Sequence, residues 1–138
     1  MQRLGEVLEV EVGYAAGPEG GGVAYAALNG AEGRKVVRLP FRIVRRRLLV
    51  ERAVAYAALV TVARSLCKRG VTRAHFVMPD RRFVEEVTGR CDVPEALALP
   101  YVRLRCALNA FHDVEIGTGA TDELMQRAGA EVALNVAA

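Results

Sequence analysis

Residues 76–84 read FVMPDRRFV, an apolar run that ends in a single aspartate and passes directly into the start of a helix. The apolar residues 71–78 predict a buried strand, and residues 81–88, which end before Gly89, predict a short helix. In α/β proteins, ligand-binding groups collect in the crevice outside the carboxyl ends of strands. Asp80 is therefore the first candidate functional residue, although an aspartate in this place can also serve only as a helix N-cap.

Three strands are predicted before a long helix. Apolar and polar residues alternate over residues 4–12, with Val10 and Val12 on one face and glutamates on the other, which is the period of a strand. Two further strands are predicted over residues 23–28 and 36–39, each after a glycine-rich turn, and the second of them can continue past Pro40. Strands joined by such short turns form an antiparallel meander.

Helices and strands alternate in the rest of the chain. A long apolar helix is predicted from about Arg46 to Arg69, and Gly70 ends it. A second helical region opens at Pro94, the last strand covers residues 113–116, and Thr121 caps a final helix. The predicted order is three strands, a helix, a strand, two helical segments, a strand and a helix.

The composition indicates a globular chain that folds as one domain over residues 1–138. Hydrophobic residues make up 52% and charged residues 25% of the chain, which excludes a disordered protein. No apolar run approaches the roughly 20 residues of a membrane span, and the N-terminus lacks the apolar core of a signal peptide. We therefore expect a cytoplasmic protein with no membrane partner. The cysteines, Cys67, Cys91 and Cys106, lie far apart and favour neither a disulfide framework nor a zinc site.

Basic residues concentrate in one stretch of the chain, although the net charge is only +3. Residues 34–52 are rich in arginine and carry little acid. Such a cluster is either a footprint for the phosphates of a nucleic acid or a solvated face whose long side chains cover apolar surface, and the sequence favours neither. The candidate nucleic-acid-binding residues are Arg42, Arg45, Arg46, Arg47, Arg52 and Arg81.

Several local sequences, taken in order, resemble the ribonuclease H family. Residues 51–59 (ERAVAYAAL) resemble its Asn-Asn-x-Ala-Glu-Tyr-x-Ala-Leu helix, and residues 70–80 resemble its next strand, which ends in Ser-Asp-Ser. Residues 99–104 and 122–124 resemble its Leu-x-x-Leu-Tyr-x-x-Val segment and the start of its final helix. The resemblance implies an α/β, ribonuclease H-like fold: a five-stranded mixed sheet, with three antiparallel strands and then two parallel strands, flanked by helices.

The resemblance also implies a chemistry. The family hydrolyses the RNA strand of an RNA–DNA hybrid with two Mg²⁺ ions, one of which activates water while the other stabilises the leaving oxygen. Mg²⁺ prefers hard oxygen ligands. Because two neighbouring dications repel each other, several carboxylates must converge to hold them, and the family uses four.

The four family carboxylates are only partly matched in this chain. The third acid matches Asp80. The fourth matches Asp122 if the preceding loop is shortened, and Gln126 if it is not. The first-strand aspartate falls on Gly13 and the helix glutamate falls on Ala55, neither of which supplies a ligand. The resemblance therefore implies a degenerate catalytic set, in which a metal, if bound at all, would contact Asp80 and Asp122.

Two other acids lie close in sequence to the missing ones. Glu11 is two residues before Gly13 and so shares its strand face. Glu51 is four residues before Ala55 and so lies one helical turn away on the same face. A displaced carboxylate set would consist of Glu11, Glu51, Asp80 and Asp122.

We therefore expect a ribonuclease H-like protein whose catalysis is lost or strongly impaired, which needs no cofactor and which retains a role in binding nucleic acid, such as an RNA–DNA hybrid, or protein. One alternative is an active Mg²⁺- or Mn²⁺-dependent ribonuclease that uses the displaced acids. Another is a structural or oligomerisation module, such as a homodimer, because the long helix is broadly apolar and the mean hydropathy is +0.17.

Overall fold

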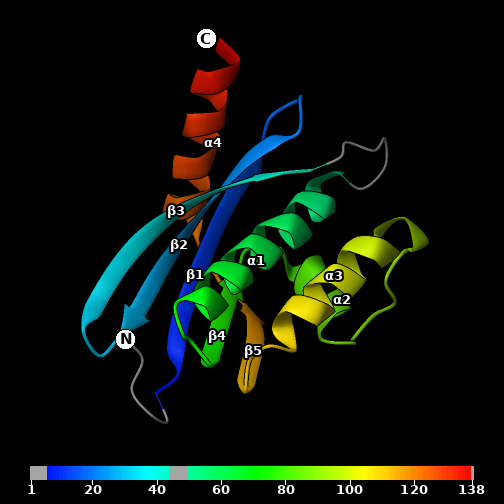
Figure 1. The fold of residues 1–138 in the computed structure, drawn as a ribbon. Coiled ribbons are helices and arrows are strands. Elements are labelled where there is room, and N and C mark those ends of the chain that lie inside the picture. The colour runs from blue at the N-terminus through cyan, green and yellow to red at the C-terminus, as the bar shows by residue number, and fades with distance from the viewer. Residues whose placement is uncertain (1–5, 44–49, 138) are drawn as a thin grey trace.

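The computed structural model describes residues 6–43 and 50–137, and its elements follow the order predicted from the sequence (Figure 1). The strands are β1 (Leu8–Ala16), β2 (Gly21–Gly30), β3 (Gly33–Arg42), β4 (Arg73–Met78) and β5 (Asp113–Thr118). The helices are α1 (Val50–Lys68), α2 (Arg81–Val87), α3 (Ala98–Leu108) and α4 (Asp122–Ala137), with a short 3-10 turn, η1 (Glu95–Leu97), before α3.

The five strands form one mixed sheet in the order β3-β2-β1-β4-β5. Strands β3, β2 and β1 are antiparallel, and β1, β4 and β5 are parallel, so the predicted sheet is confirmed. The pairing of β1 with β4 ends at Glu11 and Val77, whereas its pairing with β2 continues to Ala16 and Gly22. Residues 12–16 of β1 therefore extend beyond β4 and pair only with β2.

Some boundaries differ from those predicted. Strand β1 runs on to Ala16, which limits the turn before β2 to residues 17–20, where Gly20 adopts a φ of 92°. Strand β3 begins earlier than predicted, at Gly33, and takes the alternative of continuing through Pro40, because an edge strand can turn a missing N–H away from the sheet. Helix α1 begins at Val50 in the described residues, and the predicted helical residues 46–49 lie outside them.

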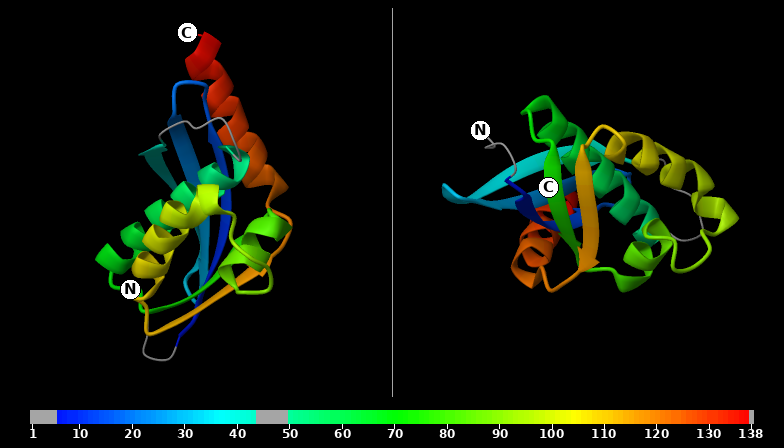
Figure 2. Two further views of the ribbon diagram at one scale, coloured as in Figure 1. Left: turned by 90° about the vertical axis from the view of Figure 1, so that its right-hand side faces the viewer. Right: turned by 90° about the horizontal axis from the view of Figure 1, so that it is seen from below.

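Helices cover both faces of the sheet and create two cores (Figure 2). Helices α1, α2 and α3 share the larger core, where the Phe76 and Phe111 rings meet edge to face at 5.8 Å. Helix α4 packs on the opposite face, with Leu124 and Ala128 against β2. The broad apolar surface of α1 is explained by its position between the sheet and α3. No helix in the described part of the chain is long and apolar enough to cross a bilayer.

A buried carboxylate joins α1 to α2. Glu86 is almost fully buried and accepts a hydrogen bond of 3.1 Å from the Tyr56 hydroxyl. The guanidinium Nε atoms of Arg52 and Arg82 lie 3.5 Å and 3.7 Å from Glu86 Oε2. Burial, together with the neighbouring Glu86 carboxylate, raises the pKa of Tyr56 far above its usual range. Because an unpaired buried charge is costly, this cluster fixes the first turns of α1 to α2.

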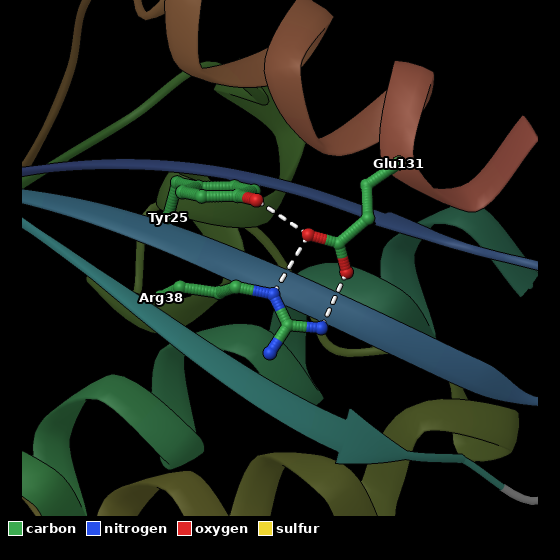
Figure 3. Close-up of polar contacts among 3 residues, drawn as sticks. All are labelled: Tyr25, Arg38 and Glu131. Carbon is green, nitrogen blue, oxygen red and sulfur yellow. Dashed lines mark hydrogen bonds and ion pairs between the residues drawn. The ribbon is translucent and has the colours of Figure 1, made fainter. Parts of the chain in front are cut away.

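A second polar cluster holds α4 against the sheet (Figure 3). Arg38 on β3 donates from Nε and Nη2 to the two carboxylate oxygens of Glu131, at 2.7 Å and 2.6 Å. The hydroxyl of Tyr25 on β2 donates to the same carboxylate, and the Arg127 guanidinium stacks over the Tyr25 ring at 4.7 Å. The hydrogen bonds from Arg38 outweigh partial burial and lower the pKa of Glu131 to about 2. This charge-assisted pairing sets the position of α4 along β2 and β3.

Replacing Glu131 by Gln should lower the melting temperature by a few degrees at neutral pH, because the pairing with Arg38 is lost. The folded pKa of Glu131 lies near 2, below its usual value of 4.5. Its contribution to stability should therefore be complete above about pH 5 and disappear as the pH falls toward 2. Thermal melts of the wild type and the variant between pH 2 and pH 7 measure this difference.

The matched control is Glu123→Gln, which removes an exposed carboxylate from the first turn of the same helix. Its effect on the melting temperature should be small. If the difference in melting temperature between the wild type and Glu131→Gln stays constant down to pH 2, that result would contradict the assigned pairing.

Candidate functional site

A cleft of about 620 Å³ opens where the carboxyl ends of β1 and β4 meet the first turn of α1 and the start of α4. A crevice in this position is the usual ligand site of α/β sheets. Its walls come from four elements that are far apart in the sequence. The lining residues are Tyr14, Ala15, Ala16, Glu51, Val54, Pro79, Asp80 and Met125.

Asp80 serves two purposes at this cleft. Its Oδ1 accepts a hydrogen bond of 3.1 Å from the Phe83 N–H, so it is the N-cap of α2. The same residue lines the cleft, because β4 ends at Met78 and Pro79 carries the chain past the sheet. The two interpretations of Asp80 made from the sequence are therefore compatible: the cap fixes the carboxylate at the edge of the cleft.

Glu51 is the second carboxylate of the cleft. It lies in the first turn of α1 and lines the cleft together with Asp80. Both carboxylates act on Tyr14, whose pKa is raised far above its usual range, first by burial and then by the negative charges of Asp80 and Glu51. The phenol, which lines the cleft together with both carboxylates, is uncharged at neutral pH.

Tyr14, and not Gly13, is the β1 residue that faces the two carboxylates. Gly13 lies on the face covered by α4, where an added Cβ would be 2.4 Å from the backbone carbonyl carbon of Leu124. Tyr14 lies on the opposite face, in the larger core and in the cleft. A side chain at residue 13 would therefore face α4 instead of Asp80 and Glu51.

The main chain of Tyr14 also fixes the start of α4. Beyond Glu11, β1 has no partner on the side of β4, so the backbone groups of that edge need other partners. The Tyr14 N–H donates to the Met125 Sδ at 3.2 Å. A thioether is only a weak acceptor, but together with the contact at Gly13 it brings the first turn of α4 directly over β1.

Comparison with known proteins identifies the architecture. No model of a known protein family and no curated protein matches this chain. The crystal structure of RNase H1 from the halophilic archaeon Halobacterium salinarum NRC-1 superimposes with a TM-score of 0.74 at 19% identity, covering 93% of this chain and 98% of that one. The fold is that of ribonuclease H.

Two further structures give the same result. The N-terminal RNase H domain of rv2228c from Mycobacterium tuberculosis matches with a TM-score of 0.69 at 17% identity, covering 94% of this chain and 99% of that one. LC11-RNase H1 in complex with an RNA/DNA hybrid matches with a TM-score of 0.69 at 10% identity, covering 95% of this chain and 99% of that one. At these identities the likeness establishes the ribonuclease H-like fold.

The structure brings together only part of the predicted carboxylate set. Glu51 and Asp80 line one cleft, as described above. Glu11 lies elsewhere: it accepts a hydrogen bond of 3.2 Å from Asn29 Nδ2 and lies 4.0 Å from Arg34 Nη2. Asp122 is exposed in the first turn of α4 and is not among the lining residues.

The two remaining positions implied by the ribonuclease H resemblance also supply no ligand. Ala55 is fully buried in the larger core, where a glutamate would lose its hydration. Gln126 is exposed on α4 and does not line the cleft. The cleft therefore holds two carboxylates and one neutral phenol.

The described residues do not fit the metal pair of a ribonuclease H. Within residues 6–43 and 50–137, no three His, Cys, Asp or Glu side chains are placed so that they could hold a metal ion. Two adjacent Mg²⁺ ions require converging oxygen ligands in near-octahedral geometry. Beside Glu51 and Asp80, Tyr14 supplies a single phenol oxygen in place of the two oxygens of a carboxylate.

The predicted nucleic-acid-binding arginines are in different surroundings. Arg52 is held by the buried Glu86. Arg81 is 82% exposed, with Glu85 at 3.8 Å. Arg42 is exposed and lines a second cavity of about 370 Å³ between the turn before β2 and the outer half of α4. Arg45, Arg46 and Arg47 lie outside the described residues.

Gly13→Ala should destabilise the fold by at least about 1–3 kcal/mol, because the new Cβ would meet backbone atoms of Leu124 and Met125 at 2.4–2.5 Å. The matched control is Gly129→Ala on α4, where an added Cβ meets no atom within 4 Å. That substitution should stabilise the helix by roughly 0.5–1 kcal/mol. Urea unfolding of both variants separates the two cases, and equal stability of Gly13→Ala and the wild type would contradict the close contact.

Proposed function

We propose that this chain is a non-hydrolytic ribonuclease H-like protein that binds nucleic acid. The observation that carries the loss of hydrolysis is Tyr14, which fills the β1 position facing Glu51 and Asp80. The contact between Gly13 and the start of α4 supports it, since no side chain can be added there without moving the helix.

The chemistry of phosphodiester hydrolysis explains why this change matters. Two-metal catalysis needs cations that activate water and neutralise the leaving oxygen. Without those cations, the carboxylates of Glu51 and Asp80 keep the cleft negative, and negative charge disfavours an approaching phosphate. The cleft that other ribonuclease H folds devote to hydrolysis is thus unfavourable for phosphate in this chain.

Nucleic-acid binding is supported by the fold and by the charge of the chain. LC11-RNase H1 has been solved with an RNA/DNA hybrid, which makes a hybrid duplex the first ligand to test. The chain is net positive at +3, and exposed arginines and lysines can replace the counterions of a duplex. We expect binding that weakens steeply as salt is raised.

Self-association is the alternative, and one observation favours it. Leu99 and Val102, one turn apart on α3, are each 53% exposed. Exposed apolar side chains in one place often mark an interface. A single monomeric species in sedimentation velocity at micromolar concentration would exclude this alternative.

A labelled RNA–DNA hybrid incubated with the full chain in Mg²⁺ or Mn²⁺ should not be cleaved faster than with the variant Asp80→Asn. This result is expected because Asp80 has too few carboxylates beside it to hold the metal pair. Denaturing gels measure the cleavage. Metal-dependent cleavage by the wild type that is lost in Asp80→Asn would overturn the proposal and favour the displaced carboxylate set.

A further inference from the structure

Helices α1 and α3 lie side by side on one face of the sheet (Figures 1 and 2). Both carry exposed basic residues. The sequence contains no acidic residue over residues 52–79 or over residues 96–112, so the outer surfaces of both helices carry charge of a single sign beyond Glu51. We call this surface the α1–α3 basic face. Its exposed cations are Arg64, Lys68, Arg69, Arg103 and Arg105.

These cations differ from five arginines elsewhere in the described chain in having no carboxylate partner. Arg34, Arg38, Arg52, Arg81 and Arg82 each lie within 4.0 Å of a glutamate oxygen. Within the described residues, none of the cations of the α1–α3 basic face forms an ion pair. A group of exposed cations without ion pairs is the electrostatic footprint of a phosphate-binding surface.

The fold holds the two cationic helix ends together. The N–H groups of His112 and Asp113 donate to the Thr72 carbonyl at 2.8 Å and 3.2 Å, which joins the turn after α3 to the turn after α1. Beneath that junction the Phe76 and Phe111 rings are in edge-to-face contact. The α1–α3 basic face is therefore a preorganised surface, which reduces the entropy lost when a ligand binds.

The α1–α3 basic face is also remote from the acidic cleft. Glu51 in the first turn of α1 lines the cleft, whereas Lys68 ends the same helix. At a rise of about 1.5 Å per residue, these residues lie roughly 25 Å apart along the helix. A phosphate backbone on the basic face would thus avoid Glu51 and Asp80 and would need no metal ion.

We infer that the α1–α3 basic face binds the phosphate backbone of a duplex nucleic acid, with Arg64, Lys68, Arg69, Arg103 and Arg105 as the contacting side chains. The inference rests on the proposed nucleic-acid binding and places it at the end of α1 opposite to the cleft. Contacts of this kind read charge and shape, not base sequence.

The test measures binding of the full chain to labelled duplexes by fluorescence anisotropy at several salt concentrations. The duplexes are an RNA–DNA hybrid, a double-stranded DNA and a double-stranded RNA, and all three have the same base sequence. The double variant R64Q/R105Q should bind hybrid roughly tenfold more weakly at low salt, with a salt-dependence slope shallower by about 2, because two phosphate contacts are lost. Glutamine is a good helix former, so both helices should persist.

The control is R34Q/R127Q, which also lowers the net charge from +3 to +1 but acts on the side of the sheet that α4 covers. Its affinity should stay within about threefold of the wild type.

A third variant, R42Q/R81Q, tests two of the arginines predicted from the sequence. If R64Q/R105Q unfolds by circular dichroism, R64Q and R105Q are measured singly, each with an expected loss of about threefold.

The possible outcomes separate the two proposals. If the wild type binds none of the three duplexes at low salt, the proposed function fails and the inference fails with it. If the wild type binds but R34Q/R127Q or R42Q/R81Q weakens binding as much as R64Q/R105Q, the proposed function stands and the inference is overturned. Poly-glutamate of equal total charge is the competitor that tests for an acidic protein ligand. If it displaces the hybrid as effectively as unlabelled duplex does, the face is assigned to acidic proteins and the inference is overturned.

Discussion

The close contact between Gly13 and the first turn of α4 is the constraint on which the candidate site depends. The backbone of Leu124 occupies the space that any β1 side chain would need at this position. The bond from the Tyr14 N–H to Met125 and the pairing of Glu131 with Arg38 and Tyr25 hold the helix in its first turn and just past its middle. With α4 fixed in this way, residue 13 cannot contribute a side chain to the cleft.

The pleat of β1 then decides what the cleft contains. Successive side chains of a strand alternate between faces, so the neighbour of Gly13 is the residue that meets Glu51 and Asp80. That residue is Tyr14, and burial beside two negative charges raises the pKa of its phenol far above the usual range. The fold of a ribonuclease H is retained, while the cleft lacks the ligands for a metal pair and exposed cations without an ion pair among the described residues lie on α1 and α3.

The sequence was sufficient for the fold and for half of the site. Hydrophobic periodicity, glycine turns and the order of the family-like segments predicted every element, and Asp80 and Glu51 do line one cleft. The resemblance places the lost aspartate at Gly13, whereas the alternation with Val10 and Val12 indicates that Tyr14, the next residue, points into the larger core and the cleft. The pairing of Arg52 with Glu86 depends on how α1 meets α2, which local sequence does not encode.

The most direct test is Mn²⁺ binding, measured by isothermal titration calorimetry on the wild type, on Tyr14→Asp and on Tyr14→Asn. Asparagine has nearly the same shape as aspartate but carries no charge. Each variant is checked for folding by circular dichroism. The account predicts saturable Mn²⁺ binding only for Tyr14→Asp, since that variant alone adds a third carboxylate facing Glu51 and Asp80. Saturable binding by the wild type that is lost in Asp80→Asn, or a folded Tyr14→Asp that binds no better than Tyr14→Asn, would contradict it.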